Sequence, residues 1–156
     1  MAKNAGESVT RDQLIRGLQE DLSREYQAIL AYVVYSQAIK GAQYMAIAQE
    51  LEVHAAEELA HAITIAKQLD YLGAMPNATA LSVTLSDDPT TMLRADLDNE
   101  NKTIRAYRER VRQCEALGEF AVGEEIREIL RQEQEHQMDL AAALGEDVPD
   151  VSKMKR

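Results

Sequence analysis

The stretch that decides the fold spans residues 51–72 and reads LEVHAAEELAHAITIAKQLDYL. It contains neither glycine nor proline, the two residues that most strongly interrupt regular structure. Apolar side chains recur in it at alternating spacings of three and four, which is the period of one helix face. One carboxylate, Glu58, falls on the same face, three residues before His61. The stretch therefore predicts an amphipathic helix whose buried side carries charged groups.

Working outward, four stretches free of glycine and proline divide the chain. They cover roughly residues 18–40, 42–72, 90–117 and 124–144, and each carries a helical stripe. Thr10 with Gln13 predicts a capping box, and Asp88 before Pro89 predicts another helix start. The expected C′ glycines are Gly41, Gly73, Gly118 and Gly145. A strand is conceivable only at residues 80–85, so the chain is predicted to be all-α.

The connections between these helices indicate the topology. Two of them, near Gly41 and at 118–123, are short, which predicts antiparallel helix pairs. The connection from Gly73 to Asp88 is long enough to run the length of a bundle. We expect a four-helix bundle of two antiparallel hairpins joined by one long crossover. It should form a single domain, 1–156, with the bundle at about 10–145 and flexible tails at 1–9 and 146–156.

Composition excludes several classes of protein. The 156 residues include 17 basic and 27 acidic ones, and the formal net charge of −10 disfavours binding to DNA or to an anionic membrane surface. No run of 18 apolar residues predicts a transmembrane helix, and the first residues do not resemble a signal peptide. The single cysteine, Cys114, excludes an internal disulfide or a cysteine-based metal cluster. We expect a cytoplasmic protein.

Glutamates interrupt the apolar stripe of all four predicted helices. They are Glu25, Glu58, Glu100 and Glu133. Burying an unpaired carboxylate is costly, so four of them in one bundle need a shared partner. Two are followed three residues later by a histidine, in Glu58-Leu-Ala-His61 and Glu133-Gln-Glu-His136. Residues three apart share a helix face, so each pair can bind the same metal centre.

These residues recur at a fixed offset of 75. Glu25 precedes Glu58 by 33 residues, and Glu100 precedes Glu133 by the same number. The offset also maps Tyr32 onto Tyr107. Four carboxylates balance the charge of two divalent ions, and mixed carboxylate and imidazole ligation suits iron or manganese, with zinc as a further candidate. The pattern therefore predicts a dinuclear site; the alternatives are solvent-facing glutamates or a metal-free helical module that binds a partner protein.

The pattern resembles the ferritin-like di-iron carboxylate proteins, and most of all the bacterioferritins. The resemblance covers roughly residues 14–144, including EYQAILAY at 25–32, EELAH at 57–61, MLRADL at 92–97 and EILRQEQEH at 128–136. It implies that Glu25 and Glu100 are terminal ligands and that Glu58 and Glu133 bridge. It also implies that His61 and His136 each complete one metal and that Tyr32 lies near the metals, where it supplies an electron.

Two positions depart from related patterns. Leu59 stands where bacterioferritins carry a haem-ligating methionine, so haem is not expected. Thr103 stands where rubrerythrins carry a further glutamate, and one cysteine cannot build their four-cysteine domain. Tyr32 and Tyr107 are expected to hydrogen-bond to ligand glutamates of a neighbouring helix. His54 is interpreted as an ordinary surface or inner-wall histidine, and Cys114 as a small buried hydrophobe.

The resemblance implies a ferroxidase that binds two iron ions per subunit, oxidises Fe(II) with O₂ or H₂O₂ and stores iron inside a protein cage. The alternative with the same ligands is a di-manganese catalase or a small di-iron oxidase or peroxidase. After Gly145 only EDVPDVSKMKR remains, which leaves no room for the full fifth helix of 24-subunit ferritins. Dps-like cages of 12 subunits lack that helix, so a homo-oligomer of 12 is expected ahead of one of 24.

Overall fold

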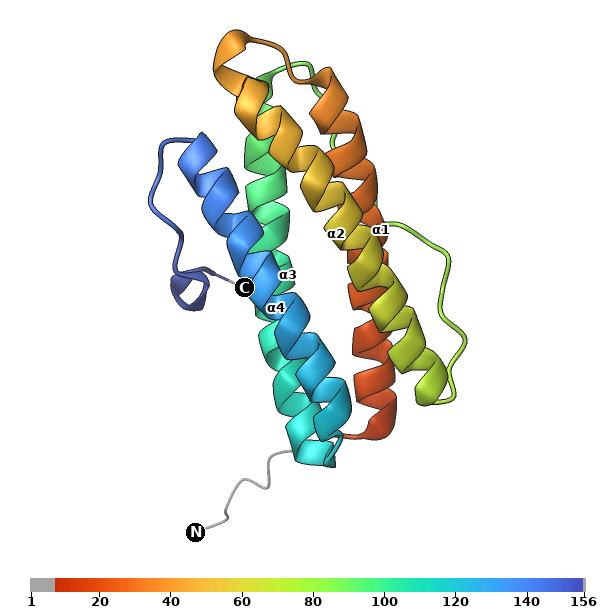
Figure 1. The fold of residues 1–156 in the computed structure, drawn as a ribbon. Helices are drawn as coiled ribbons and strands as arrows, with labels where there is room; N and C mark the ends of the chain where they lie inside the picture. The colour runs from red at the N-terminus through yellow and green to blue at the C-terminus, as the bar shows by residue number, and fades with distance from the viewer. Residues whose placement is uncertain (1–7, 156) are drawn as a thin grey trace.

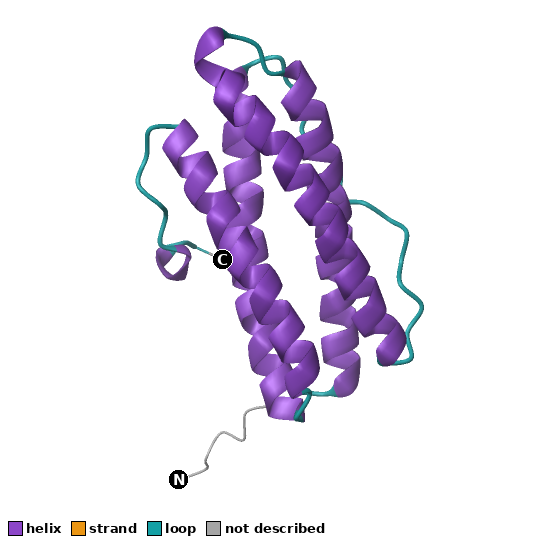
Figure 2. Ribbon diagram, in the orientation of Figure 1, coloured by secondary structure: helices purple, strands orange, loops and turns teal. Residues whose placement is uncertain are grey.

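A computed structural model describes residues 8–155 and shows four long helices and two short 3₁₀ turns. The helices are α1 (Arg11–Ala38), α2 (Met45–Tyr71), α3 (Pro89–Leu117) and α4 (Phe120–Ala143). The 3₁₀ turns are η1 (Ala42–Tyr44) and η2 (Val151–Lys153). Figure 1 shows α1 paired with α2 and α3 paired with α4 in one elongated bundle. The predicted all-α four-helix bundle is confirmed, and no strand occurs within 8–155, including the segment 80–85 (Figure 2).

The helix ends follow the predicted capping signals with one exception. Gln13 and Thr10 make both hydrogen bonds of a capping box, and Asp88 accepts a hydrogen bond from the backbone N–H of Thr91 at 2.9 Å. Gly118 ends α3 with a positive φ of 73°, as its lack of a Cβ allows. Gly41 is different: α1 stops at Ala38 with the extended residue Ile39, and Gly41 instead precedes η1. The prediction that Gly41 is a C′ glycine was therefore wrong.

Two apolar clusters fill the interior of the bundle. One includes Leu14, Leu18, Leu22, Ile65, Leu69 and Ile126, and the other includes Tyr35, Leu51, Met92, Leu97 and Leu140. Burying each such side chain contributes roughly 1.5–3 kcal/mol, so these clusters dominate the stability of the fold. Cys114 belongs to the first cluster and is fully buried, as expected for a small hydrophobe. The polar centre described below lies between the two clusters.

The long crossover lies against the outer side of α1 (Figure 1). The side-chain amide of Asn77 donates to the backbone carbonyl of Gln19 at 2.8 Å, and the hydroxyl of Tyr26 donates to the carbonyl of Asn77 at 2.9 Å. Further along, Gln27 donates to the carbonyl of Ser82 at 2.7 Å. Tyr26 and Gln27 of α1 thus satisfy backbone carbonyls that a loop without secondary structure cannot pair itself, and Asn77 adds a side-chain bond from the crossover to α1. This path delivers the chain to the start of α3 at the other end of the bundle.

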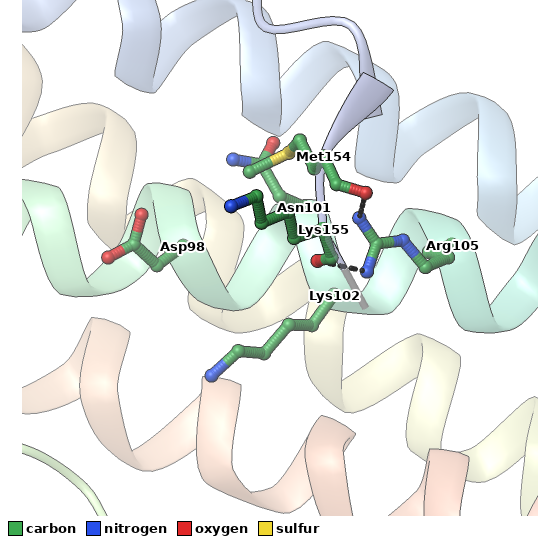
Figure 3. Close-up of a pocket in the computed structure, with 6 residues that line it drawn as sticks. All are labelled: Asp98, Asn101, Lys102, Arg105, Met154 and Lys155. Atoms are coloured by element: carbon green, nitrogen blue, oxygen red, sulfur yellow. Dashed lines mark hydrogen bonds between the residues drawn. The ribbon is translucent and has the colours of Figure 1, made fainter. Parts of the chain in front are cut away.

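The segment after Gly145 packs on α3. Val151 is buried, and the guanidinium of Arg105 donates to the backbone carbonyls of Val151 at 3.2 Å, Met154 at 3.1 Å and Lys155 at 3.1 Å. Figure 3 shows the last two of these bonds at one side of a surface hollow. Arg105 and the buried Val151 thus attach part of the segment 146–156, for which the sequence predicts a flexible tail, to the bundle. The tail expected at 1–9 falls mostly on residues 1–7, outside the described part of the chain.

Candidate metal centre

All six candidate ligands lie together in the middle of the bundle. Each helix contributes one glutamate, and α2 and α4 each add a histidine: Glu25, Glu58, His61, Glu100, Glu133 and His136. None of them is more than 3% exposed. The period of the apolar stripe explains this placement, since each glutamate occupies a core-facing position of its own helix.

The ligands form two overlapping groups. One consists of Glu25, Glu58, His61 and Glu133, and the other of Glu58, Glu100, Glu133 and His136. In each group the ligand atoms all lie within 4.8 Å of one another. Glu58 and Glu133 belong to both groups, whereas every other ligand belongs to one. The geometry therefore offers two metal positions that share two carboxylates.

The carboxylate oxygens of the shared glutamates are divided between the two histidines. Glu133 Oε1 lies 2.7 Å from His61 Nδ1, and Glu133 Oε2 lies 3.8 Å from His136 Nδ1. Glu58 Oε1 lies 2.7 Å from His136 Nδ1, and Glu58 Oε2 lies 3.6 Å from His61 Nδ1. Each carboxylate thus directs one oxygen toward each metal position, which is the arrangement that a bridging ligand requires.

Many of these atoms have no hydrogen-bond partner among the described residues. The buried atoms without one include Glu25 Oε2, Glu58 Oε1, Glu100 Oε2, both oxygens of Glu133, and the Nδ1 atoms of His61 and His136. Unsatisfied polar atoms are rare in protein interiors because their desolvation is costly. Nitrogen and oxygen ligand atoms that gather in two groups, with two nitrogen–oxygen pairs only 2.7 Å apart, fit divalent cations, and this set of ligand atoms suits iron, manganese or zinc.

Without metal, burial and mutual repulsion shift the pKa values of the ligands. Burial, followed by repulsion from Glu133, raises the pKa of Glu100 to about 8, and burial with the same neighbour raises that of Glu58. Burial alone would lower the pKa of His136, but contacts with Glu100 and Glu133 outweigh it and raise the pKa to about 11. The metal-free centre therefore holds protons at neutral pH, and cations compete with those protons for the same atoms.

Two tyrosines tie the terminal glutamates to the opposite hairpin. Tyr32 of α1 donates a hydrogen bond to Glu100 Oε1 of α3 at 2.5 Å, and Tyr107 of α3 donates to Glu25 Oε1 of α1. Both tyrosines are buried. The predicted hydrogen bonds from tyrosines to ligand glutamates of a neighbouring helix are thus present, and they leave the second oxygen of each carboxylate for a cation.

The two histidines differ in what holds them. His61 Nε2 lies 2.6 Å from the amide oxygen of Gln132, which can only accept, so the ring proton sits on Nε2 and Nδ1 is left as a ligand. His136 Nε2 has no such partner, and the nearest carboxylate oxygen, from Glu57, is 3.5 Å away. Its ring instead stacks on the ring of His54, with centroids 4.0 Å apart.

His54 is the residue that sequence reasoning placed wrongly. It is 1% exposed and lies beneath the surface between Tyr32 and His136, not on it. Burial, then the neighbouring His136, lowers its pKa. One signal existed: His54 precedes His61 by seven residues, two helical turns, which puts both on the same face of α2.

Two buried aspartates also went unnoticed. Asp21 and Asp96 each lie one helical turn before a terminal glutamate and are related by the same 75-residue offset. Asp21 forms a buried ion pair with Arg110, whose Nε lies 2.7 Å from Asp21 Oδ2. Asp96 Oδ2 has no partner among the described residues, and burial followed by repulsion from Glu100 raises the pKa of Asp96. The repeat in the sequence could have revealed both positions but not their different partners.

Among the described residues, no helix combines the length and apolar character needed to cross a lipid bilayer.

The chain is similar to two bacterioferritins. It is 25% identical over 142 residues to one from Brucella melitensis biotype 1, covering 86% of this chain and 88% of that protein. It is 23% identical over 125 residues to one from Desulfovibrio desulfuricans, covering 80% of this chain and 70% of that protein.

The chain is also similar to a solved structure. A protein from Bacillus anthracis str. Ames, described as a ferritin like, diiron-carboxylate protein, superposes with a TM-score of 0.82 at 27% identity, covering 89% of this chain and 99% of that one. Residues 15–147 match the family described as Ferritin, a Ferritin-like domain. That match spans most of the chain and all six candidate ligands, and the chain therefore belongs to the ferritin-like family.

Proposed function

We propose that this protein is a ferroxidase that binds two Fe(II) ions per chain as substrates and oxidises them with O₂ or H₂O₂. The observation that carries the proposal is the division of the oxygens of Glu58 and Glu133 between two metal positions. A pair of adjacent ions can deliver two electrons together. Two Fe(II) become two Fe(III), while O₂ with two protons yields H₂O₂, or H₂O₂ with two protons yields two water molecules.

The residues of the chain have distinct roles in this proposal. Glu25 and His61 complete one iron position, and Glu100 and His136 complete the other. Tyr32 and Tyr107 orient the terminal carboxylates through their hydrogen bonds. Tyr32 also lies edge-on to His136, with ring centroids 5.9 Å apart, which supports the expectation that its phenol lies near the metals. Protons displaced by Fe(II) from the ligands leave the centre as it loads.

The test is a pair of isosteric variants with a surface control. Anaerobic loading with two equivalents of Fe(II), followed by air, should give a fast ferric absorbance in the near ultraviolet. We expect Glu58→Gln and Glu133→Gln to slow this phase by more than about 100-fold, since outer partners of metal ligands alone are worth roughly 10- to 100-fold. Glu124→Gln, an exposed position on α4, serves as the control and should leave the rate unchanged.

An unchanged fast phase in both bridging variants would show that iron is oxidised elsewhere. The same donor set accepts manganese, so metal analysis of protein from its native source and an oxygen-evolution assay with peroxide belong to the test. Rapid catalytic O₂ release with manganese bound would replace the ferroxidase proposal with a di-manganese catalase, and turnover of an organic substrate with iron bound would replace it with a small oxidase or peroxidase.

We further propose that the chains assemble into a closed cytoplasmic cage that stores the ferric product. Apolar side chains exposed on neighbouring turns of α1 and α2 support self-association: Leu30, Val33, Val34, Leu59 and Ile63. Native mass spectrometry should find a mass near twelve times 17.4 kDa, and twice that mass would indicate a 24-subunit shell. A monomer or dimer would contradict storage while leaving the dinuclear centre untouched.

A further inference from the structure

A second group of candidate ligands lies outside the dinuclear centre. Glu50 and His54 of α2 and Asp139 of α4 offer ligand atoms that all lie within 4.8 Å of one another. His54 Nε2 and Asp139 Oδ2 are 3.0 Å apart. None of the three belongs to the two overlapping groups of the dinuclear centre. They thus form a separate cluster with two carboxylates and one imidazole.

The histidine of this cluster is held rigidly. Its ring stacks on His136 with centroids 4.0 Å apart and meets Tyr32 edge-on at 5.1 Å. With 1% of its surface exposed, the side chain has no freedom to turn away, and its Nε2 is aimed at Asp139. His54 Nδ1 has no hydrogen-bond partner among the described residues, so it can carry the ring proton when Nε2 binds a cation.

The carboxylates of the cluster meet solvent. Glu50 and Asp139 line an open surface groove together with Ala46, Ile47, Ala142 and Ala143. No basic side chain is among these lining residues, so nothing within the groove neutralises the two acids. A cation can therefore approach from water and meet oxygen ligands first, with a fixed nitrogen beneath them.

We propose that Glu50, His54 and Asp139 form an accessory site for one divalent transition cation of the Fe(II), Mn(II) or Zn(II) class. Two oxygen donors and one nitrogen donor suit these ions and leave coordination positions for water. Hard cations such as Mg²⁺ favour all-oxygen sites, and the buried imidazole selects against them. The site goes beyond the proposed ferroxidase function and does not depend on it, because it shares no ligand with the dinuclear centre.

The experiment uses Zn(II), which has no redox chemistry, and the full chain. After equilibrium dialysis we expect three Zn(II) per chain in the wild type and two in the double variant Glu50→Gln/Asp139→Asn. These substitutions are nearly isosteric and lie at the surface, whereas replacing His54 would remove packing from His136. The matched control, Asp98→Asn/Glu124→Gln, removes the same charge from exposed positions of α3 and α4 and should still bind three.

Anomalous diffraction from crystals grown with Zn(II) locates the ions. A peak between Glu50, His54 and Asp139 that disappears in the double variant supports the accessory site. Two ions in the dinuclear centre with none at the accessory site would overturn this inference and leave the proposed function standing. One ion at the accessory site with an empty dinuclear centre would support the accessory site and contradict the proposed function. Zinc bound only at other surface positions would overturn it too.

Discussion

The two hairpins of the bundle carry the same ligand pattern in different surroundings. In the first, Asp21 lies one turn before Glu25 and is paired with Arg110. In the second, the corresponding Asp96 lies one turn before Glu100 and has an oxygen without a partner. The residue that the 75-residue offset relates to Arg110 is Tyr35, whose hydroxyl bonds the carbonyl of Thr84 in the crossover instead. The ligands are duplicated, but the charges behind them are not.

The histidines show the same contrast. Gln132 fixes the ring of His61 through a 2.6 Å hydrogen bond, whereas His136 rests on the ring of His54 and has no hydrogen bond at Nε2. Each half thus receives one hydrogen bond from a tyrosine. Only the first half adds an ion pair and a hydrogen bond to its histidine, and only the second adds ring packing on its histidine. We infer that the first half is the more rigid.

The largest expected difference between the halves concerns the buried aspartates. Asp21→Asn leaves the Arg110 guanidinium buried without a counter-charge, which should lower the free energy of unfolding by about 3–5 kcal/mol. Asp96→Asn should change it by less than about 1 kcal/mol, because burial raises the pKa of Asp96 and so favours its neutral form, which the neutral asparagine amide resembles. Urea denaturation of both metal-free variants measures the difference, and equal losses would contradict the contrast.

Part of the pH dependence of stability should come from the second half. Without metal, the folded-state pKa of Glu100 is about 8, above its ordinary value of 4.5, and that of Asp96 is also raised. The folded state therefore binds more protons than the unfolded state, and stability falls as pH rises from about 4.5 to 8. The Tm of the metal-free protein should drop by several degrees over that window.

Two comparisons sharpen the pH prediction. Asp96→Asn removes one of the responsible groups and should flatten the curve. With divalent metal bound the trend should reverse, because cations displace the protons more easily at higher pH. A metal-free Tm that rises with pH would show that the second half does not hold the extra protons.

A smaller difference concerns the two histidines. Gln132→Leu removes the acceptor that orients His61, and we expect it to weaken Zn(II) binding at the dinuclear centre by about 10- to 100-fold. Glu57→Gln changes the side chain whose oxygen lies 3.5 Å from His136 Nε2, and it should have little effect, since no hydrogen bond exists there to lose. Competition with a chromophoric chelator measures both affinities. A larger loss in Glu57→Gln would reverse the assignment of the rigid half.

The smallest expected effect is a loss of stability that should be equal in the two halves. Tyr32→Phe and Tyr107→Phe each remove one hydrogen bond to a terminal glutamate, so each should lower the free energy of unfolding by about 1 kcal/mol. Thermal unfolding of the two variants, side by side, checks whether they match. A clear inequality would mean that the asymmetry reaches the terminal ligands themselves.

The four helices and the six candidate ligands could be predicted from the sequence because both follow from local periodicity. The gaps in glycine and proline predicted four helices, and the 75-residue repeat brought out Glu25, Glu58, His61 and their counterparts. What remained hidden depends on contacts between distant residues. Arg110 of α3 pairs with Asp21 of α1, which is distant in the sequence. Arg105 binds backbone carbonyls of the C-terminal segment, and every residue type has such a carbonyl, so the sequence gives no signal of this contact.

His54 shows how a pattern can be present and still mislead. It lies two turns before His61, yet it lacks the glutamate three residues earlier that marked the other two histidines. A histidine without that neighbour reads as a surface residue until the ring stacking on His136 is known. Periodicity states which face a residue occupies, but the partner on the opposite helix decides its role.

The sharing of Glu58 and Glu133 also bears on how the chain folds. In the first metal group, the hairpin of α1 and α2 supplies Glu25, Glu58 and His61, and α4 supplies Glu133. The second group in turn includes Glu58, which comes from α2. Neither hairpin can therefore build a complete coordination sphere alone. Each bound ion cross-links two segments whose only covalent connection is the crossover at residues 72–88. Occupancy of the centre should slow separation of the hairpins and so lengthen the lifetime of the native state.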